Sequence, residues 1–203
     1  MKPIKSVLVL AIMLAPALAG AQGYYGPGPA PYPGGFHHRM GRLAWGFSLG
    51  LGAMNDDGGK ITCDNCDYST ATFEVDAHLG GFVTPRFALM AEFQGNGQTV
   101  HQTGYDTTEF SQGAAMLAGQ FWLTPQLWIK GGIGFAHIDV QDDFNGTYQP
   151  VDNGLALMGA VGFELMSARF FALDLQGRLI EGSYDGVNDH VTSGTIGLGL
   201  NWY

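Results

Sequence analysis

Residues 43–53 read LAWGFSLGLGA, and large and small residues alternate along this stretch. The odd positions from Leu43 to Leu51 are bulky and apolar, whereas the even positions between them hold only Ala, Gly and Ser. Successive side chains of a β-strand point to opposite faces, so the stretch predicts a strand with one bulky apolar face and one face of small side chains.

The same period of two returns seven more times toward the C-terminus. The further stretches are residues 73–83, 87–93, 115–123, 127–135, 155–165, 171–179 and 196–202. Each is long enough to form a β-strand, and each keeps its apolar residues on one face. Because eight is an even number, the first strand starts on the side of the sheet where the last one ends.

The connections between these stretches alternate in length. Residues 84–86, 124–126 and 167–169 form short turns, whereas 54–69, 97–107, 141–153 and 182–188 form longer polar loops. Short periplasmic turns and longer outer loops are typical of bacterial outer-membrane barrels. Aromatic residues near the short turns, among them Phe82, Trp122, Trp128, Trp202 and Tyr203, predict a girdle at the membrane interface.

The composition separates a membrane barrel from a soluble β protein. Charged residues make up 13% of the chain, about half of what is usual in soluble domains, and glycine is frequent at 32 residues. A soluble sandwich or lipocalin-like barrel would carry solvating side chains opposite its apolar face, but here that face is mostly Gly, Ala and Ser. We therefore predict an all-β, eight-stranded antiparallel up-and-down transmembrane β-barrel.

The N-terminal residues predict export. Lys2 and Lys5 precede an apolar run at residues 6–18, and small residues follow, so 1–21 is predicted to be a signal peptide cleaved before Gln22. Residues 22–41, rich in Gly and Pro, are predicted to form a flexible periplasmic leader, and 42–203 the barrel. The mature chain would keep seven basic and eighteen acidic side chains, a formal charge of −11, which argues against nucleic acid as a partner.

In topology and pattern, residues 42–203 resemble the small outer-membrane β-barrel superfamily of OmpA, OmpX and OmpW-like proteins. The resemblance implies a bacterial outer-membrane location, periplasmic termini and outer-membrane lipid as a partner, and we expect a monomer. It also implies that the barrel-assembly machinery reads an aromatic residue of the C-terminal strand. Tyr203 matches the terminal aromatic of the family, but the apolar phase of the strand runs through Leu200 and Trp202, so either aromatic residue remains a candidate.

The small-residue face also carries eight ionisable side chains, which we expect in the lumen. They are Glu74, Asp76, His78, Glu92, Lys130, Glu164, Asp174 and Arg178. Buried charges must pair, so one interpretation is a salt-bridge network in which Lys130 and Arg178 neutralise carboxylates and plug the barrel. The other is a narrow path that prefers cations, because five acids outnumber two bases.

Two cysteines lie close together in the first long loop. Cys63 and Cys66 are separated by two residues, and in an oxidising location such neighbours usually pair, so we predict a disulfide that stiffens the loop. No second Cys/His pair stands at a zinc-site spacing, and no thioredoxin-like context surrounds the two cysteines.

The long loops are acidic. Thirteen of the eighteen acidic residues lie in or beside them, including Asp56, Asp64, Asp142 and Asp185. The loops are either a solvated, repulsive surface or a place where divalent cations such as calcium bind, because Ca²⁺ takes six to eight oxygen ligands.

No motif in the chain names a reaction or a cofactor. We expect a non-enzymatic outer-membrane protein with a structural or surface-interaction role and acidic extracellular loops. The first alternative is a narrow channel for small cationic or apolar solutes. The second is a lipid-modifying hydrolase using Asp189, His190 and Ser193, although His190 and Ser193 would point to opposite faces of a strand.

Overall fold

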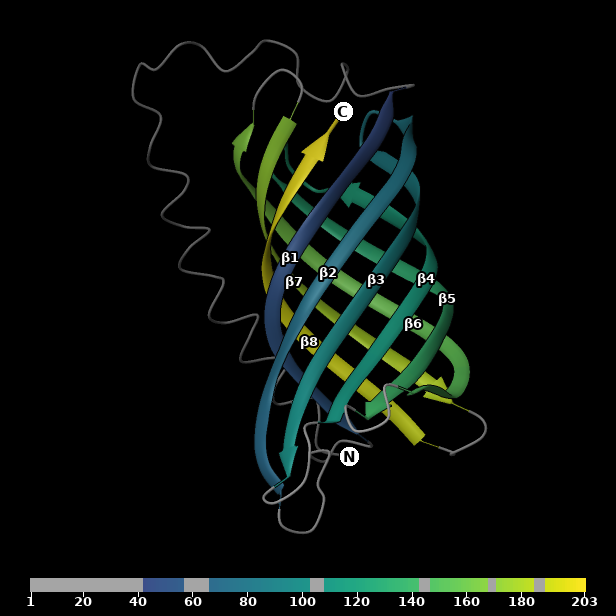
Figure 1. Ribbon diagram of the computed structural model, residues 1–203. Helices are drawn as coiled ribbons and strands as arrows, with labels where there is room; N and C mark the ends of the chain where they lie inside the picture. The colour runs from purple at the N-terminus through teal and green to yellow at the C-terminus, as the bar shows by residue number, and fades with distance from the viewer. Residues whose placement is uncertain (1–41, 57–65, 103–107, 143–146, 168–170, 185–188) are drawn as a thin grey trace, which may run out of the picture. The chain divides into compact units, whose positions relative to one another are not determined.

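Eight antiparallel strands close into a barrel in the computed structural model (Figure 1). The structure describes residues 42–56, 66–102, 108–142, 147–167, 171–184 and 189–203. The strands are β1 (Leu43–Asp56), β2 (Cys66–Thr84), β3 (Phe87–Gln102), β4 (Thr108–Trp122), β5 (Leu127–Asp142), β6 (Thr147–Ser167), β7 (Phe171–Tyr184) and β8 (Asp189–Trp202). Each strand pairs with its sequence neighbours, and β1 pairs with β8, so the predicted up-and-down barrel is confirmed.

The barrel has two different ends. The hairpins β2–β3 and β4–β5 turn over short connections at one end, where β1 also begins and β8 finishes, with Trp45 opposite Trp202. We call this the turn end and the opposite one the loop end. In the β4–β5 turn, the Thr124 hydroxyl accepts a hydrogen bond of 2.9 Å from the backbone N–H of Leu127. The predicted signal peptide and leader, 1–41, and most of the third predicted turn lie outside the described residues.

Several strands are longer at the loop end than the sequence pattern predicts. The predicted loops 54–69, 97–107 and 141–153 are partly strand, since β2 begins at Cys66, β3 ends at Gln102 and β6 begins at Thr147. Backbone pairing continues there, for example between Val100 and Thr108, although the alternation of apolar side chains has stopped. The hydrophobic period therefore marks only the part of each strand whose two faces have different surroundings.

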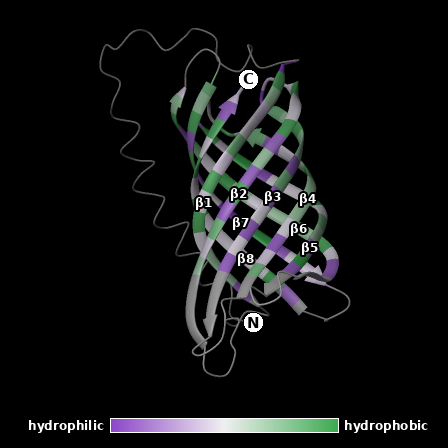
Figure 2. Ribbon diagram, in the orientation of Figure 1, coloured by the Kyte–Doolittle hydropathy of each residue, from purple (hydrophilic) through white to green (hydrophobic). Residues whose placement is uncertain are grey.

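The outer face of the barrel is apolar and uncovered by protein. Hydrophobic and hydrophilic residues alternate along the strands in Figure 2. Large outward side chains keep much of their surface free, for example 55% for Leu79 and 77% for Phe135. A soluble protein rarely leaves a continuous surface of this kind in water, whereas lipid solvates it. Among the residues that the structure describes, no helix is long and apolar enough to cross a membrane.

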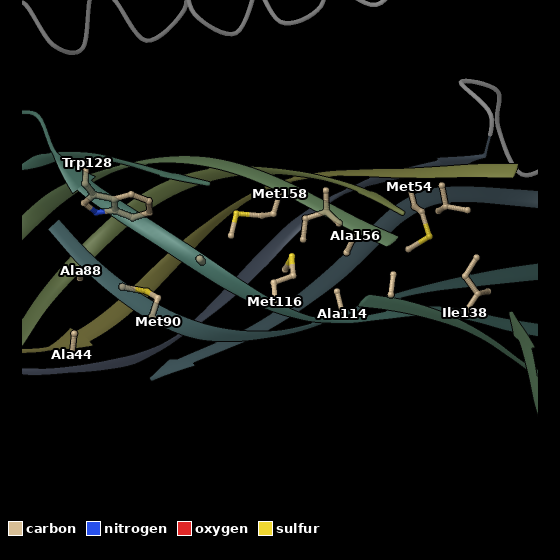
Figure 3. Close-up of a cluster of buried hydrophobic side chains, with 14 of the residues drawn as sticks. Ala44, Met54, Ala88, Met90, Ala114, Met116, Trp128, Ile138, Ala156 and Met158 are labelled. Atoms are coloured by element: carbon tan, nitrogen blue, oxygen red, sulfur yellow. The ribbon is translucent and has the colours of Figure 1, made fainter. Parts of the chain in front are cut away.

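The inner face combines small residues with a few methionines and tryptophans. Ala44, Ala88 and Ala156 are buried there, and Met90, Met116 and Met158 project into the interior (Figure 3). At Gly134 the neighbouring strand is so close that an added Cβ would lie 2.0 Å from the carbonyl oxygen of Ala115. The barrel is thus filled by its own side chains, as expected for eight strands.

The predicted aromatic girdle is partly wrong. Phe82, Trp122 and Trp128 are buried inside the barrel, with 5%, 1% and 1% of their surfaces exposed. Each of them stands one residue from an outward apolar side chain, so the alternation of the strand turns it inward. Trp45 and Trp202 do face outward, where their rings stack with centroids 4.3 Å apart and planes 7° apart.

Candidate functional site: the ionisable side chains of the lumen

One group of ionisable side chains lies in the middle of the lumen. This middle cluster consists of Glu74, Asp76 and His78 from β2, Glu92 from β3, Lys130 from β5 and Arg178 from β7. The period of two turns each of them inward, and the three carboxylates and two cationic side chains are almost completely buried. Charges in such a place are costly unless they are paired and hydrogen-bonded.

Arg178 joins three carboxylates from two other strands. Its Nη1 lies 2.9 Å from Oδ2 of Asp76 and 3.2 Å from Oε1 of Glu74, while its Nη2 lies 3.0 Å from Oε1 of Glu92. The planar guanidinium presents several donors at fixed angles, so one arginine can serve more than one carboxylate. Because Arg178 starts from β7 and its partners from β2 and β3, the ion pairs cross the lumen.

Lys130 completes the neutralisation of Glu92. Its Nζ lies 2.9 Å from Oε2 of Glu92 and donates a hydrogen bond of 3.2 Å to Oε1. Glu92 therefore contacts both cations of the middle cluster, one from β7 and one from β5. The three carboxylates face one guanidinium and one amino group, with the imidazole of His78 3.7 Å from Asp76.

Neutral side chains add donors that the charge pattern alone does not reveal. The hydroxyl of Ser48 donates a bond of 3.3 Å to Oδ1 of Asp76, its direct cross-strand partner, and the hydroxyl of Thr195 donates to Oε2 of Glu74. Both residues stand at inward positions of their strands, which is the signal by which the sequence could have identified them.

The two remaining predicted acids form a separate group at the turn end. In this turn-end cluster, Glu164 and Asp174 are cross-strand partners on β6 and β7, and both are fully buried. The indole N–H of Trp122 donates to Oε1 of Glu164 over 2.9 Å, and that of Trp128 donates to Oδ2 of Asp174 over 2.8 Å. The inward tryptophans are thus hydrogen-bond donors to carboxylates rather than interface anchors.

Polar and aromatic side chains from the C-terminal strand close this cluster. Asn201 donates to Oδ2 of Asp174 over 2.8 Å, and the hydroxyl of Tyr203 donates to Oε1 of Glu164 over 2.6 Å. The ring of Tyr203 meets Trp122 edge-on with centroids 5.9 Å apart. Aromatic rings in edge-to-face contact pack favourably, and here they fill the lumen at the turn end.

The two clusters are linked through Trp128. Its N–H binds Asp174 of the turn-end cluster, and the ammonium of Lys130 lies 5.4 Å from its ring centroid. A cation at this distance from an indole face is attracted by the ring electrons. Ionisable groups and their donors are therefore in contact from the middle of the lumen to the turn end.

Toward the loop end, the interior that the structure describes contains neutral polar side chains beside apolar ones such as Met54 and Ile138. Asn96 donates to the hydroxyl of Ser193 over 2.8 Å, and Gln112 donates to that of Tyr184 over 2.8 Å. Ser193 is buried inside the barrel, whereas His190 is exposed on the outside, 3.6 Å from Glu181. The fold therefore does not bring Ser193 and His190 together as a nucleophile and its base.

The other predicted sites are described only in part. Cys66 is not a loop residue, because it begins β2 and pairs through its backbone with Gln102, while its predicted disulfide partner Cys63 lies outside the described residues. Much of the acidic loops lies outside them as well. Within the described part of the chain, no group of three or more His, Cys, Asp or Glu side chains is placed to hold a metal ion.

A closed antiparallel barrel with an apolar outer face and ionisable groups inside defines the chain as a small transmembrane β-barrel of the outer-membrane type. Solved structures have the same fold. Ail, the attachment invasion locus protein of Yersinia pestis, in complex with the heparin analogue sucrose octasulfate, aligns over 79% of this chain and 99% of Ail, with 12% identity and a TM-score of 0.56. Neisserial surface protein A aligns over 79% of this chain and 95% of its own, also with 12% identity and a TM-score of 0.56.

At this identity the likeness concerns the fold. No family model matches the sequence, and no curated protein matches it.

Proposed function

We propose that this chain is an integral outer-membrane protein that catalyses no reaction and acts as a rigid structural or surface-interaction barrel. The apolar side chains of the outer face, here called the apolar belt, support insertion of the barrel into a lipid bilayer. On β6 the outward apolar positions run from Leu155 to Leu165, and on β7 from Phe171 to Leu179. Strands of about 9–11 tilted residues cross a bilayer, and both runs fall in that range.

The observation that carries the structural role is a set of ion pairs between almost fully buried side chains that cross the lumen. Arg178 of β7 forms ion pairs with carboxylates of β2 and β3, and Lys130 of β5 forms an ion pair with Glu92. At the turn end, Phe82, Trp122 and Tyr203 pack against one another. A lumen filled in this way favours the role of a rigid barrel that presents its loops. It disfavours the role of a channel that conducts solutes.

The orientation follows from the difference between the two ends. The short turns are proposed to face the periplasm, together with both termini after signal-peptide cleavage, and the acidic loops the outside. In the last strand, Trp202 faces lipid and Tyr203 faces the lumen, which favours Trp202 as the aromatic read by the barrel-assembly machinery. The Cys63–Cys66 disulfide, divalent cations at the acidic loops and a monomeric state remain predictions.

Two measurements on the detergent-folded protein test this proposal. Unboiled and boiled samples should differ in mobility on the same gel, since a closed barrel resists detergent. The unboiled protein should then give no discrete conductance steps in a planar bilayer. Identical mobility together with solubility in plain buffer would overturn the membrane assignment.

A narrow channel is the second candidate, and the observation that favours it is an uncharged part of the wall of the lumen, contributed by β4 and β6 on either side of β5. Met116, Ala118 and Met158 line this wall without charge, beside the ion pairs of the other strands. Reproducible conductance steps that become smaller in Asp76→Asn would support a cation path and count against the closed frame. Lipid hydrolysis that disappears in Ser193→Ala would instead revive the hydrolase alternative.

A further inference from the structure

A shallow groove lies at the turn end of the barrel, where the first and last strands meet. It is open, has a volume of about 340 Å³, and is lined by Arg42, Leu43, Trp45, Trp202 and Tyr203. Its outer wall is the stacked pair Trp45 and Trp202, with Phe47 adjoining Trp202 at a centroid distance of 5.9 Å. The groove is therefore lined both by outward-facing residues of the barrel wall and by residues at its rim.

The two parts of the groove differ in polarity. Leu43 and Trp45 are outward residues of the apolar belt, with 62% and 42% of their surfaces exposed. Arg42 immediately precedes β1. Its carbonyl accepts a hydrogen bond of 3.0 Å from the N–H of Phe82, which fixes the backbone of Arg42 at the rim. Its side chain is exposed, and in the described part of the chain it forms no ion pair. A cation thus lies next to an apolar surface at the edge of the belt.

The sign of this charge fits its end of the barrel. The exposed charged side chains described at the turn end, Arg42 and Arg86, are both basic, whereas the exposed Glu181 and the partly buried Asp139 stand at the loop end. A basic rim beside a lipid-facing surface attracts anionic head groups, and guanidinium groups match phosphate geometry through two parallel hydrogen bonds. Tryptophan side chains prefer the same depth, between acyl chains and head groups.

We propose that this groove is a binding site for one phospholipid of the adjoining leaflet. The guanidinium of Arg42 binds the phosphate diester, and one acyl chain lies along Leu43 and against the Trp45–Trp202 stack. Leu43 and Trp45 follow Arg42 within β1, so a molecule with a phosphate next to an acyl chain can contact all three. The site rests on the proposed membrane location of the barrel.

The site is tested by lipid retention in native mass spectrometry. The protein is inserted into nanodiscs that contain equal amounts of phosphatidylglycerol and of diacylglycerol with the same acyl chains, and is then released into detergent. We expect one phosphatidylglycerol to remain bound in preference to diacylglycerol. Arg42→Gln should reduce this retention about threefold to fivefold, the range of an exposed charge pair worth up to ~1 kcal/mol.

The matched control is Arg86→Gln, which removes the other exposed arginine of the turn end outside the groove and should retain lipid as the wild type does. Millimolar inorganic phosphate should not displace the lipid, because the acyl chain contributes to binding. Equal losses in both variants, equal retention of diacylglycerol, or displacement by phosphate would each overturn the site. A protein that inserts but retains no lipid overturns only this site, whereas one that does not insert overturns the proposed membrane function.

Discussion

The hydroxyl of Tyr203 donates a hydrogen bond of 2.6 Å to Glu164 inside the barrel, while the neighbouring Trp202 stacks on Trp45 outside it. The two last residues thus connect β8 to both faces of the barrel. Glu164 belongs to β6, so the inner contact reaches past β7 to the next strand but one, whereas the outer contact joins the paired strands β1 and β8. Tyr203 and Trp202 thus stabilise the turn end by one contact inside the barrel and one outside it.

Removing the inner contact should weaken the barrel measurably. Tyr203→Phe keeps the ring packing but loses the hydrogen bond to a charged group, so we expect a loss of about 1.5–3 kcal/mol in the free energy of unfolding. Urea titration of the protein in lipid vesicles, followed by tryptophan fluorescence, measures this change. Trp202→Phe, which retains an aromatic ring against Trp45, serves as the control and should cost less. Equal stability of Tyr203→Phe and the wild type would show that this bond contributes nothing.

Arg178 is the side chain on which the middle cluster most depends. Arg178→Met leaves Glu74, Asp76 and Glu92 buried with one cation fewer, and breaking buried pairs in this way costs about 3–5 kcal/mol. The same urea titration should show this loss, while Arg86→Gln at the exposed turn should stay within ~0.5 kcal/mol of the wild type. A mild effect of Arg178→Met would mean that water or protonation compensates the carboxylates.

The pair of Glu92 and Lys130 can be isolated by a double-mutant cycle. Glu92→Gln and Lys130→Met should each destabilise the barrel, and the double variant should lose less than the sum of the two. A coupling energy of about 0.5–3 kcal/mol is expected for side chains in direct contact. Strict additivity in the urea-derived free energies would contradict a direct interaction between the two residues.

Two glycines that face opposite sides of the barrel should respond differently to a methyl group. At Gly134 an added Cβ would lie 2.0 Å from the carbonyl oxygen of Ala115, whereas at Gly159 nothing lies within 4 Å. Gly134→Ala should therefore cost about 1–3 kcal/mol through overpacking, and Gly159→Ala should be nearly neutral. The fraction that still migrates as a folded band in an unboiled gel reports both. Equal fractions would indicate that the wall at Gly134 can relax.

An arginine on the outer face distinguishes lipid from water as its surroundings. Leu79 lies near the middle of the belt of β2 with half of its surface exposed. In a bilayer, Leu79→Arg should cost roughly 2–4 kcal/mol, whereas on a water-exposed surface it should change stability by less than ~0.5 kcal/mol. Refolding into vesicles and urea titration separate the two outcomes, with Leu79→Ala as the uncharged control.

Local pattern predicts much of this fold and little of its internal pairing. Alternation such as that of residues 43–53 determines which side chains face lipid, and the even number of strands places the two ends of the barrel wall together. The same alternation assigns Trp122 and Trp128 to the interior, although grouping them with nearby aromatics suggested a girdle. Phase was the better guide, because backbone geometry obliges each side chain to follow it.

The partners of each inward side chain follow from contacts that cross the lumen. That Arg178 meets Glu92, or that Thr195 meets Glu74, depends on which strands come together once the barrel closes. No short segment contains that information. The strand limits at the loop end were also missed. There β2 and β3 continue as paired backbone, but no apolar alternation in the sequence marks them.

The ion pairs of Arg178 have a consequence for how the barrel assembles. They join β7 to β2 and β3, and the bond between Thr195 and Glu74 spans 121 residues of sequence. Contacts of such long sequence separation form late and slowly. Until β8 meets β1, Arg178 and its carboxylates have no fixed geometry, so a partly closed barrel gains little from them. The network therefore stabilises only the completed barrel and adds little to a partly closed one.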